Sequence, residues 1–283
     1  MTPTPESPYL SMSGNGPSSH GDSGVGVIET DHLLTLRGIA KNFGAVQALQ
    51  HVDLDIPSGQ VTALIGDNGA GKSTLIKTIA GIHPPSAGRI YWRGREVHIY
   101  TPRIATDLGI ATVYQDLALC DNLDVVQNMF LGQEMTRKGL LDEIQMELET
   151  IKTLSDLSVS TVKSVRQLVG SLSGGQRQAV AVARAVMRDS QMVILDEPTA
   201  ALGVSQTAHV LDLIRMLASR GIAVIVISHN LNDVFSVADR IAVMHLGTLV
   251  SQGPIVDYDT TSAVELITTG ESDRVPSPLT SNK

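Results

Sequence analysis

The sequence predicts an α/β fold with a mainly parallel sheet, an antiparallel β subdomain and an inserted helical lobe. Three observations lead to this prediction. A glycine-rich turn at residues 66–73 joins an apolar strand to a helix. Further short apolar strands alternate with amphipathic helices after it, as they do in parallel sheets covered on both faces. Between residues 125 and 188 there is helical periodicity but little strand signal, which indicates a helical insertion.

Composition describes an ordinary globular protein and excludes several classes. Hydrophobic residues make up 42% and charged residues 18% of the 283 residues. The net charge of -8 argues against nucleic acid as a partner, because binding to a phosphate backbone needs a basic face. Cys120 is the only cysteine, so no intrachain disulfide can form and a reducing compartment is expected. The sequence shows no secretory signal and no apolar run long enough to cross a membrane. If the protein acts at a membrane, we therefore expect it to act from the membrane surface.

The chain is expected to hold one folded domain at residues 31–270 between two tails. Residues 1–30 are rich in Ser, Gly, Pro and Thr and predict a disordered tail, and the polar residues 271–283 predict a flexible one. Two antiparallel strands are expected before the glycine-rich turn. In chain order, the expected strands and turns are 33–36, 49–56, 61–65, 88–94, 110–114, 192–195, 222–227, 240–244 and a hairpin about residue 247.

Helices are expected between these strands. Their ranges are 73–79, 101–108, 174–183, 203–220 and 231–237, and a helical lobe is expected at about 116–188. Within the lobe, Leu141, Ile144, Leu148 and Ile151 recur at spacings of three and four and predict an amphipathic helix whose apolar side is buried. On the helix at 203–220, one apolar stripe is expected from Val204 to Leu217. Ser173 is expected to cap the helix that follows it.

The turn at 66–73 fits the pattern G-x-x-x-x-G-K-[ST] and predicts a P-loop NTPase core. Unsatisfied N–H groups and the helix dipole attract an anion to the start of the following helix, and glycines let a polyphosphate approach the backbone. Lys72 is expected to neutralise phosphates, and the Ser73 hydroxyl to bind Mg²⁺. The expected ATP-binding residues are Gly66, Asp67, Asn68, Gly69, Ala70, Gly71, Lys72, Ser73 and Thr74.

Two carboxylates at the end of the strand at 192–195 complete the expected chemistry. Phosphoryl transfer needs an acidic group near the metal, and Asp196 suits that position. Glu197 follows it and can orient an attacking water or accept its proton. The alternative interpretation of Asp196, Glu197 and Pro198 is a strand end followed by a turn.

The order and spacing of these motifs resemble those of the ATP-binding cassette (ABC) ATPases over roughly residues 33–250. The resemblance also includes Gln115, the stretch 172–176 (Leu-Ser-Gly-Gly-Gln) and His229. The resemblance implies that Phe43 stacks on adenine, although a core phenylalanine is the alternative. It implies that Gln115 contacts Mg²⁺ and the attacking water, the alternative being a surface glutamine. It also implies that His229 contacts the γ-phosphate, the alternative being a helix-capping histidine.

The resemblance further implies a dimer. The signature residues Ser173, Gly174, Gly175 and Gln176 would contact the γ-phosphate held by a second copy of the chain, so that two copies enclose two ATP molecules. Most family members carry Asp where this chain has Gly203, which implies altered communication between the two sites. The expected partners are therefore a second copy, a transmembrane permease and, indirectly, an extracytoplasmic solute-binding protein, with the chain on the cytoplasmic face of the membrane.

Residues 199–204, 114–119 and 128–132 are similar to those of single-cassette importers of ribose, xylose, fructose and related monosaccharides. An ATPase subunit of a monosaccharide importer is thus the expected function. Three alternatives stay open: a cassette for another small solute, a soluble cassette acting on ribosomes or DNA, and a regulatory module that binds nucleotide without hydrolysis. Intact Glu197 and His229 disfavour the last.

Overall fold

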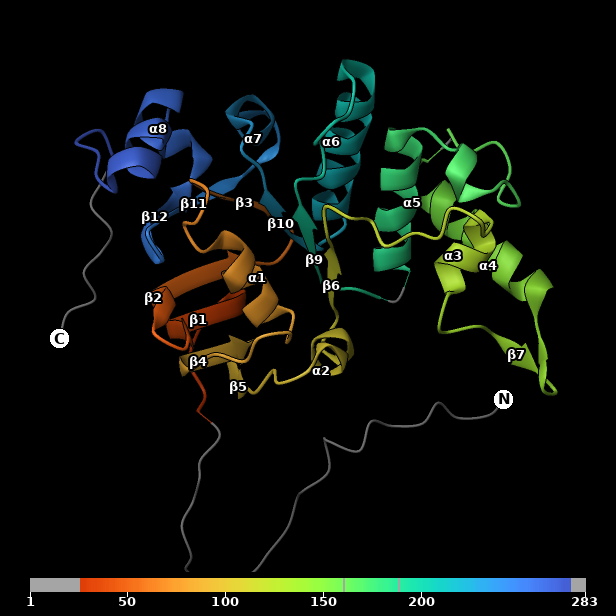
Figure 1. Ribbon diagram of the computed structural model, residues 1–283, viewed down its shortest axis with the longest axis horizontal. Helices are drawn as coiled ribbons and strands as arrows, with labels where there is room; N and C mark the ends of the chain where they lie inside the picture. The colour runs from red at the N-terminus through yellow and green to blue at the C-terminus, as the bar shows by residue number, and fades with distance from the viewer. Residues whose placement is uncertain (1–25, 160, 188, 276–283) are drawn as a thin grey trace, which may run out of the picture.

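The computed structural model describes residues 26–159, 161–187 and 189–275 (Figure 1). Most of the two expected tails, residues 1–25 and 276–283, lies outside these ranges. Residues 26–30 contact the folded chain: Ile28 N donates to the Gly94 carbonyl, and the Gly26 carbonyl accepts from Glu96 N. Beyond residue 270, the Ser272 hydroxyl donates to the Glu265 carboxylate. The described fold thus extends past both boundaries expected for the domain.

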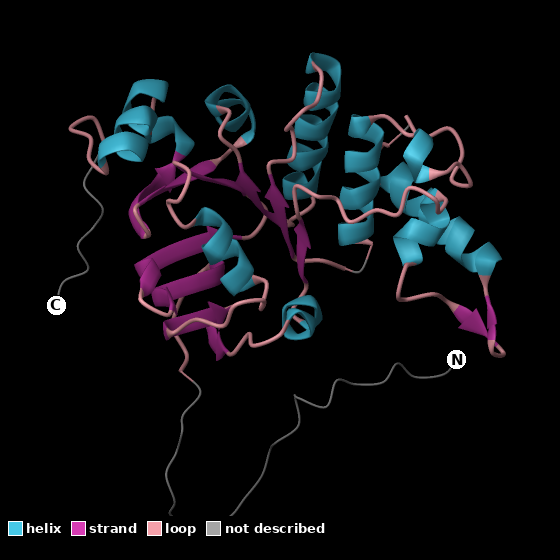
Figure 2. Cartoon of the chain, viewed as in Figure 1, coloured by secondary structure: helices cyan, strands magenta, loops and turns pink. Residues whose placement is uncertain are grey.

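A six-stranded sheet occupies the centre of the molecule (Figures 1 and 2). Its strands lie in the order β12-β11-β3-β10-β9-β6, with β12 antiparallel to β11 and the other neighbours parallel. The strands are β3 (Val61–Gly66), β6 (Ile110–Val113), β9 (Met192–Asp196), β10 (Ala223–Ile227), β11 (Arg240–His245) and β12 (Thr248–Pro254). The predicted mainly parallel sheet and the hairpin about residue 247 are confirmed.

A smaller antiparallel sheet has the order β2-β1-β4-β5. It consists of β1 (His32–Phe43), β2 (Val46–Pro57), β4 (Ala87–Trp92) and β5 (Arg95–Val97). The antiparallel strands expected before the glycine-rich turn are confirmed, and both are longer than expected. The three-residue β5 was not predicted, because so short an edge strand carries no alternation of its own.

Two apolar cores hold the central sheet between its covering layers. Along β10, Val224 and Val226 pack toward α5 (Gly174–Val186), α6 (Val204–Ser219), α7 (Leu231–Val237) and α8 (Thr260–Thr269). Ile225 and Ile227 point the other way, toward α1 (Lys72–Ile79), α2 (Pro102–Asp107) and the smaller sheet. Alternate residues of a strand face opposite sides, so both faces of β10 are buried (Figure 1). Within the described ranges, no helix has the length and apolar character that crossing a membrane requires.

The helical lobe lies at one end of the central sheet, beyond α5 (Figure 1). It contains α3 (Val125–Phe130), the short strands β7 (Thr136–Arg137) and β8 (Leu140–Leu141), α4 (Glu143–Asp156) and the 3-10 helix η1 (Val169–Ser171). The helix predicted from apolar spacing forms as α4, but the prediction of its buried side was wrong. Ile144, Leu148 and Ile151 are 75%, 56% and 48% exposed, and Leu141 lies in β8. Met146, Thr150 and Leu154 form the buried side instead.

The stripe predicted on α6 is also only partly correct. Leu211, Ile214 and Leu217 are buried, whereas Val204 is 91% exposed and Ala208 is exposed. The first turn of α6 packs against the start of α5 through Gln206, and its Val204 and Ala208 side chains face away from the core. Spacing predicted the helix correctly, but burial depends on neighbouring elements that the local sequence does not specify.

A buried amide organises the loop that enters the lobe. The side chain of Asn128 is fully buried and makes four hydrogen bonds to backbone groups. Its Oδ1 accepts from Cys120 N at 2.8 Å, and its Nδ2 donates to the carbonyls of Cys120, Leu123 and Asp124 at 3.0, 3.3 and 3.0 Å. Asn128 thereby gives the Cys120 N–H an acceptor and adds a second donor to three carbonyls that also accept from backbone N–H groups, those of Leu123, Val169 and Asn128.

Replacing this amide tests its contribution to stability. We expect Asn128→Leu to lower the free energy of unfolding by about 2–4 kcal/mol, because it removes four hydrogen bonds of a buried side chain and takes the acceptor from the Cys120 N–H. The same change at the exposed Asn232 on α7 should alter it by less than about 0.5 kcal/mol. Denaturant unfolding followed by circular dichroism measures both, and equal effects at the two positions would contradict the assigned role of Asn128.

Candidate active site

Parallel pairing brings four functional segments to one edge of the central sheet. Ile227 at the end of β10 is paired with Asp196 of β9 and with Leu64 of β3. The glycine-rich loop after β3, the Asp196–Glu197 pair and His229 after β10 therefore leave the sheet at the same carboxyl edge. Strand β6, the parallel neighbour of β9, also ends at this edge, two residues before Gln115. Ligands bind at this edge in open α/β sheets.

The glycine-rich loop presents backbone N–H groups at the start of α1. Gly66, Gly69 and Gly71 have φ values of 153°, 85° and 98°, which favour residues without a Cβ atom. A Cβ atom on Gly71 would lie only 2.9 Å from the Ala48 carbonyl oxygen. Gly71 caps α1 without a side-chain hydrogen bond, and no acidic residue lies in the first turn. The positive end of α1 thus remains available to an anion.

Lys72 lies across this loop. Its Nζ donates hydrogen bonds to the carbonyls of Gly66 and Asp67 at 2.7 and 2.9 Å. A pocket of about 490 Å³ opens over the loop and is lined by residues 46–48, 50, 68–74, 246 and 247. Polyphosphate oxygens placed there would meet the ammonium group, the Ser73 hydroxyl and the first N–H groups of α1 together.

The structure adds a wall to this pocket that the sequence did not predict. Leu246 and Gly247, in the turn between β11 and β12, line the pocket from a position far along the chain. Gly247 N donates to the Ala70 carbonyl at 3.1 Å, and the Gly247 carbonyl accepts from Gln50 N at 2.7 Å. Sequence analysis predicted the hairpin here, but no local signal connects it to a loop so far away in the chain.

Phe43 is exposed, which excludes the interpretation of a core phenylalanine. Its side chain is 44% exposed at the end of β1, and its ring meets the His83 ring edge-on with centroids 5.2 Å apart. Phe43 is paired with Val46, which lines the phosphate pocket, although Phe43 itself does not line it. An exposed ring beside the pocket is available for stacking on a base.

Burial shifts the pKa values of two charged groups at the sheet edge. Burial lowers the pKa of Lys72, while the carboxylates of Glu197, Asp67 and Asp196 act in the opposite direction. The pKa of Asp196 is raised by burial and by the neighbouring Glu197 carboxylate, and Lys72 and Lys77 partly offset this. The two acidic groups repel one another and attract Lys72, so this edge favours a bound cation as well as phosphate.

Glu197 and His229 form a direct pair. Nδ1 of His229 lies 2.8 Å from Oε2 of Glu197, and the Glu197 side chain is 16% exposed against 76% for His229. Glu197 has a φ of 50°, uncommon for a residue with a Cβ atom, and its N–H donates to the Ile227 carbonyl. The helix-capping interpretation of His229 is wrong, because Asn230 caps α7. The pair is oriented as a general base and its positioning partner would be.

Gln115 faces the same region. It is exposed and lines a pocket of about 430 Å³ that Glu197 also lines. Among the described residues, no group of three or more His, Cys, Asp or Glu side chains could hold a metal ion. The Ser73 hydroxyl, the Gln115 amide and the Asp196 carboxylate nevertheless suit Mg²⁺, which prefers oxygen ligands and keeps water and substrate phosphate oxygens around it.

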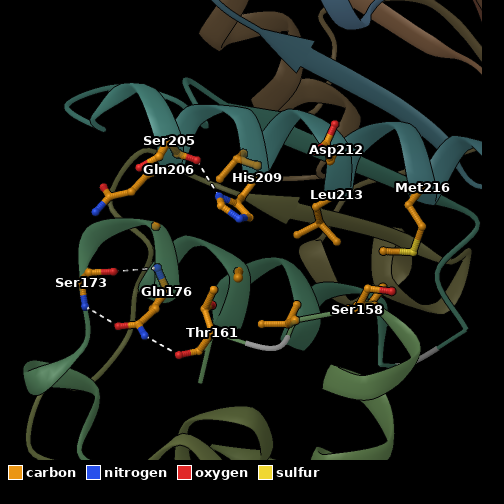
Figure 3. A pocket seen from close by; sticks show the side chains of 15 residues that line it. Ser158, Thr161, Ser173, Gln176, Ser205, Gln206, His209, Asp212, Leu213 and Met216 are labelled. Carbon is orange, nitrogen blue, oxygen red and sulfur yellow. Dashed lines mark hydrogen bonds between the residues drawn. The ribbon is translucent and has the colours of Figure 1, made fainter. Parts of the chain in front are cut away.

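The signature residues lie apart from the phosphate loop. Ser173 caps α5 as predicted: its Oγ accepts from Gln176 N, and Oε1 of Gln176 accepts from Ser173 N (Figure 3). Nε2 of Gln176 donates to the Thr161 carbonyl. Ser173, Gly175 and Gln176 line a pocket of about 560 Å³ between α5 and α6, and Gly174 lines the pocket of Gln115. None of the four lines the pocket over the phosphate loop.

Gly203 begins α6 with extended backbone and no capping side chain. Its φ is −75°, and a Cβ atom there would meet nothing within 4 Å. An aspartate would therefore fit at this position without strain. No steric contact with the described residues therefore requires glycine at position 203.

The chain is similar to known proteins. The family model for ABC transporters matches residues 49–200. The fructose import ATP-binding protein FrcA of Rhizobium meliloti is 44% identical over 243 residues, which cover 83% of this chain and 94% of the relative. The xylose/arabinose import ATP-binding protein XylG of Sulfolobus acidocaldarius is 47% identical over 77% of this chain and 86% of its own length.

Solved structures agree with the sequence relatives. A nucleotide-free ATP-binding cassette from an ABC transporter matches with a TM-score of 0.69 and 27% identity over 79% of this chain and 91% of that chain. The ADP conformation of the ABC transporter cassette MJ1267 matches with a TM-score of 0.72 and 27% identity over 85% and 96%. The family resemblance and the P-loop NTPase fold predicted from the motifs are thus confirmed, and the chain belongs to the ABC transporter family.

Proposed function

We propose that this protein is the ATP-hydrolysing subunit of an ABC importer for a monosaccharide. The observation that carries the proposal is the meeting of the phosphate loop, Asp196 and the Glu197–His229 pair at one sheet edge. Relatives of nearly the same length are named for the import of fructose and of xylose or arabinose, which supports a monosaccharide cargo.

ATP binding follows from the charge and geometry of the loop. The triphosphate lies against the N–H groups of residues 69–74, with Lys72 beside its β- and γ-phosphates. The adenine stacks on the exposed ring of Phe43, next to the strand that forms one wall of the pocket. Ser73, Asp196 and Gln115 would hold Mg²⁺, which would neutralise charge on the phosphate oxygens.

Hydrolysis requires a water positioned in line with the γ-phosphate. Glu197 is the group that orients this water and accepts its proton, and the hydrogen bond from His229 holds the carboxylate in place. Gln115 lines the same pocket as Glu197. The left-handed backbone at Glu197 fixes its direction, since it is held by the hydrogen bond to Ile227 of the neighbouring strand.

The reaction centre is completed by a second copy of the chain. Ser173 is exposed at the start of α5 and belongs to a different pocket from the phosphate loop, so it is free to contact the γ-phosphate bound by another copy. Two copies arranged head to tail then enclose two ATP molecules. ATP favours the closed dimer and hydrolysis favours the open one, because the γ-phosphate contributes to the interface.

The dimer works beneath a transmembrane permease at the cytoplasmic face of the membrane. A permease supplies the pathway for the sugar, and an extracytoplasmic solute-binding protein delivers the sugar to it. Cargo selection belongs to these partners, because the pockets of this chain that carry chemistry are the nucleotide pockets. The acidic net charge of -8 accords with a protein that does not bind nucleic acid.

Lys72→Ala tests nucleotide binding and transport together. We expect ATP affinity to fall about 10- to 100-fold, the loss of roughly 1.5–3 kcal/mol of charge-assisted hydrogen bonding to phosphate. Lys152→Ala, at an exposed position of α4, should leave affinity within about twofold. Equilibrium titration with a fluorescent ATP analogue measures both variants.

In cells that lack this chain, uptake of radiolabelled fructose, xylose and ribose should be restored by the wild type and by Lys152→Ala but not by Lys72→Ala. Equal ATP affinity in Lys72→Ala and wild type would refute the assignment of the loop. If the wild-type chain hydrolyses ATP but restores uptake of none of these monosaccharides, only the proposed class of cargo would be refuted.

Glu197→Gln tests the catalytic assignment and the dimer. The amide keeps the size of the side chain but cannot accept a proton, so hydrolysis should fall by about 100-fold or more while ATP binding persists. With saturating Mg-ATP the variant should elute as a dimer in size-exclusion chromatography with light scattering, and without nucleotide as a monomer. Glu271→Gln, exposed near the C-terminus, serves as the control. A Glu197→Gln monomer under Mg-ATP would count against the scheme.

A further inference from the structure

The segment that carries Gln115 has no regular secondary structure. Residues 115–120 follow β6 and precede α3 without forming a helix or strand. Ala118 has a φ of 49°, a left-handed conformation that residues with a Cβ atom rarely adopt, and its N–H donates to Asp116 Oδ1. A backbone in this conformation persists only where surrounding contacts hold it.

One of these contacts comes from the helix that begins at the signature. Arg184 on α5 donates from one guanidinium nitrogen to the Ala118 carbonyl at 3.0 Å and from the other to the Leu117 carbonyl at 3.3 Å. Burial lowers the pKa of the guanidinium, and the cation is retained because an arginine in a protein stays protonated. Its two planar donors fix the orientation of two successive carbonyls.

The rest of the segment is held from another direction. Asn128 on α3 binds the N–H and carbonyl of Cys120, as described above. Arg184 therefore donates hydrogen bonds from α5 to the segment itself, whereas Asn128 links the segment to the lobe. A second residue of α5, Arg177, lies 3.8 Å from the Asp121 carboxylate directly after the segment, but it does not contact the Leu117 and Ala118 carbonyls. Gln115, upstream of both, makes no side-chain hydrogen bond within the described residues and lines one pocket with Glu197 and with Gln178 of α5.

The position of Arg184 on a rigid helix matters. It lies eleven residues after Ser173 (184 − 173), roughly 16 Å along the helix at 1.5 Å per residue. Arg184 thus connects the helix that begins at the signature directly to the Leu117 and Ala118 carbonyls. In the sequence, Arg184 is recognisable as a charge directly after the apolar run 179–183 of a buried helix.

We propose that Arg184 is a positioning residue for ATP hydrolysis. It connects the segment that carries Gln115 to α5, the helix that begins at the signature, so that the position of Gln115 depends on the position of the signature. The inference rests on the proposed ATPase function. In the head-to-tail dimer Gln115 serves the chain's own ATP and the signature serves the ATP of the other copy. Arg184 thereby links the two sites from within one chain.

The test compares Arg184→Met and Arg184→Lys with wild type, alone and combined with Gln115→Ala. Methionine keeps the length of the side chain without donors, and lysine keeps the charge but cannot orient two carbonyls at once. We expect Arg184→Met to lower kcat about tenfold and Arg184→Lys about threefold, with ATP affinity within about twofold of wild type. In the Gln115→Ala background, Arg184→Met should lower kcat by less than about twofold, because the group it positions is gone.

Rates are expressed per folded, ATP-binding chain, and thermal unfolding is recorded for each variant. Arg215→Met is the matched control, because Arg215 lies on α6 and also donates to a backbone carbonyl, that of Ser236. The kcat of this variant should stay within about twofold of wild type. If Arg184→Met does not fold, Arg184→Lys decides the question in the same cycle.

Four results would overturn the inference or its premise. An unchanged kcat in both Arg184 variants would overturn the positioning role, as would equal losses in the presence and absence of the Gln115 amide. If Gln115→Ala alone hydrolyses ATP at the wild-type rate, the assignment of Gln115 fails and the inference fails with it. If wild type neither binds nor hydrolyses ATP, the proposed function fails first, and that outcome is distinct from the other three.

Discussion

The parallel alignment of β3, β6, β9 and β10 is the constraint on which the active site depends. It brings the phosphate loop, the Asp196–Glu197 pair, His229 and the segment of Gln115 to one edge of the sheet. Burial on both faces fixes this arrangement, since shifting a strand by one residue would move its side chains to the wrong core. The chemistry of the site therefore follows from strand register more than from any single contact in the loops.

A second property is that the glycine-rich loop and the signature residues lie at different pockets of the described chain. The phosphate loop lies over one pocket and the signature at the start of α5 lies at another. Under the proposed function, a second copy brings the two together. Gly203 starts α6 without a carboxylate, although a side chain would fit there. The contact of Arg184 with the Leu117 and Ala118 carbonyls offers communication between sites that does not need such a carboxylate.

Sequence predicted the parts of the fold and site that local chemistry determines. The glycines at 66, 69 and 71, the cap at Ser173 and the buried strand before Asp196 each have a local signal, and the structure contains all of them. Predictions failed where packing of distant segments decides. The apolar residues Ile144, Leu148 and Ile151 face outward on α4, and α8 carried no recognised signal. The approach of the β11–β12 turn to the phosphate loop and the role of Arg184 both join segments far apart in the chain, so only the fold reveals them.

Intermolecular cross-linking tests the trans arrangement of the site most directly. In a Cys120→Ser background, chains with Asn68→Cys are mixed with chains with Ser173→Cys, both also carrying Glu197→Gln, because residues 68 and 173 are exposed and belong to different pockets. The account predicts a covalent heterodimer on a non-reducing gel when Mg-ATP is present, and little without nucleotide. Cross-linking that is independent of ATP, or no heterodimer under saturating Mg-ATP, would contradict a site shared between two copies of the chain.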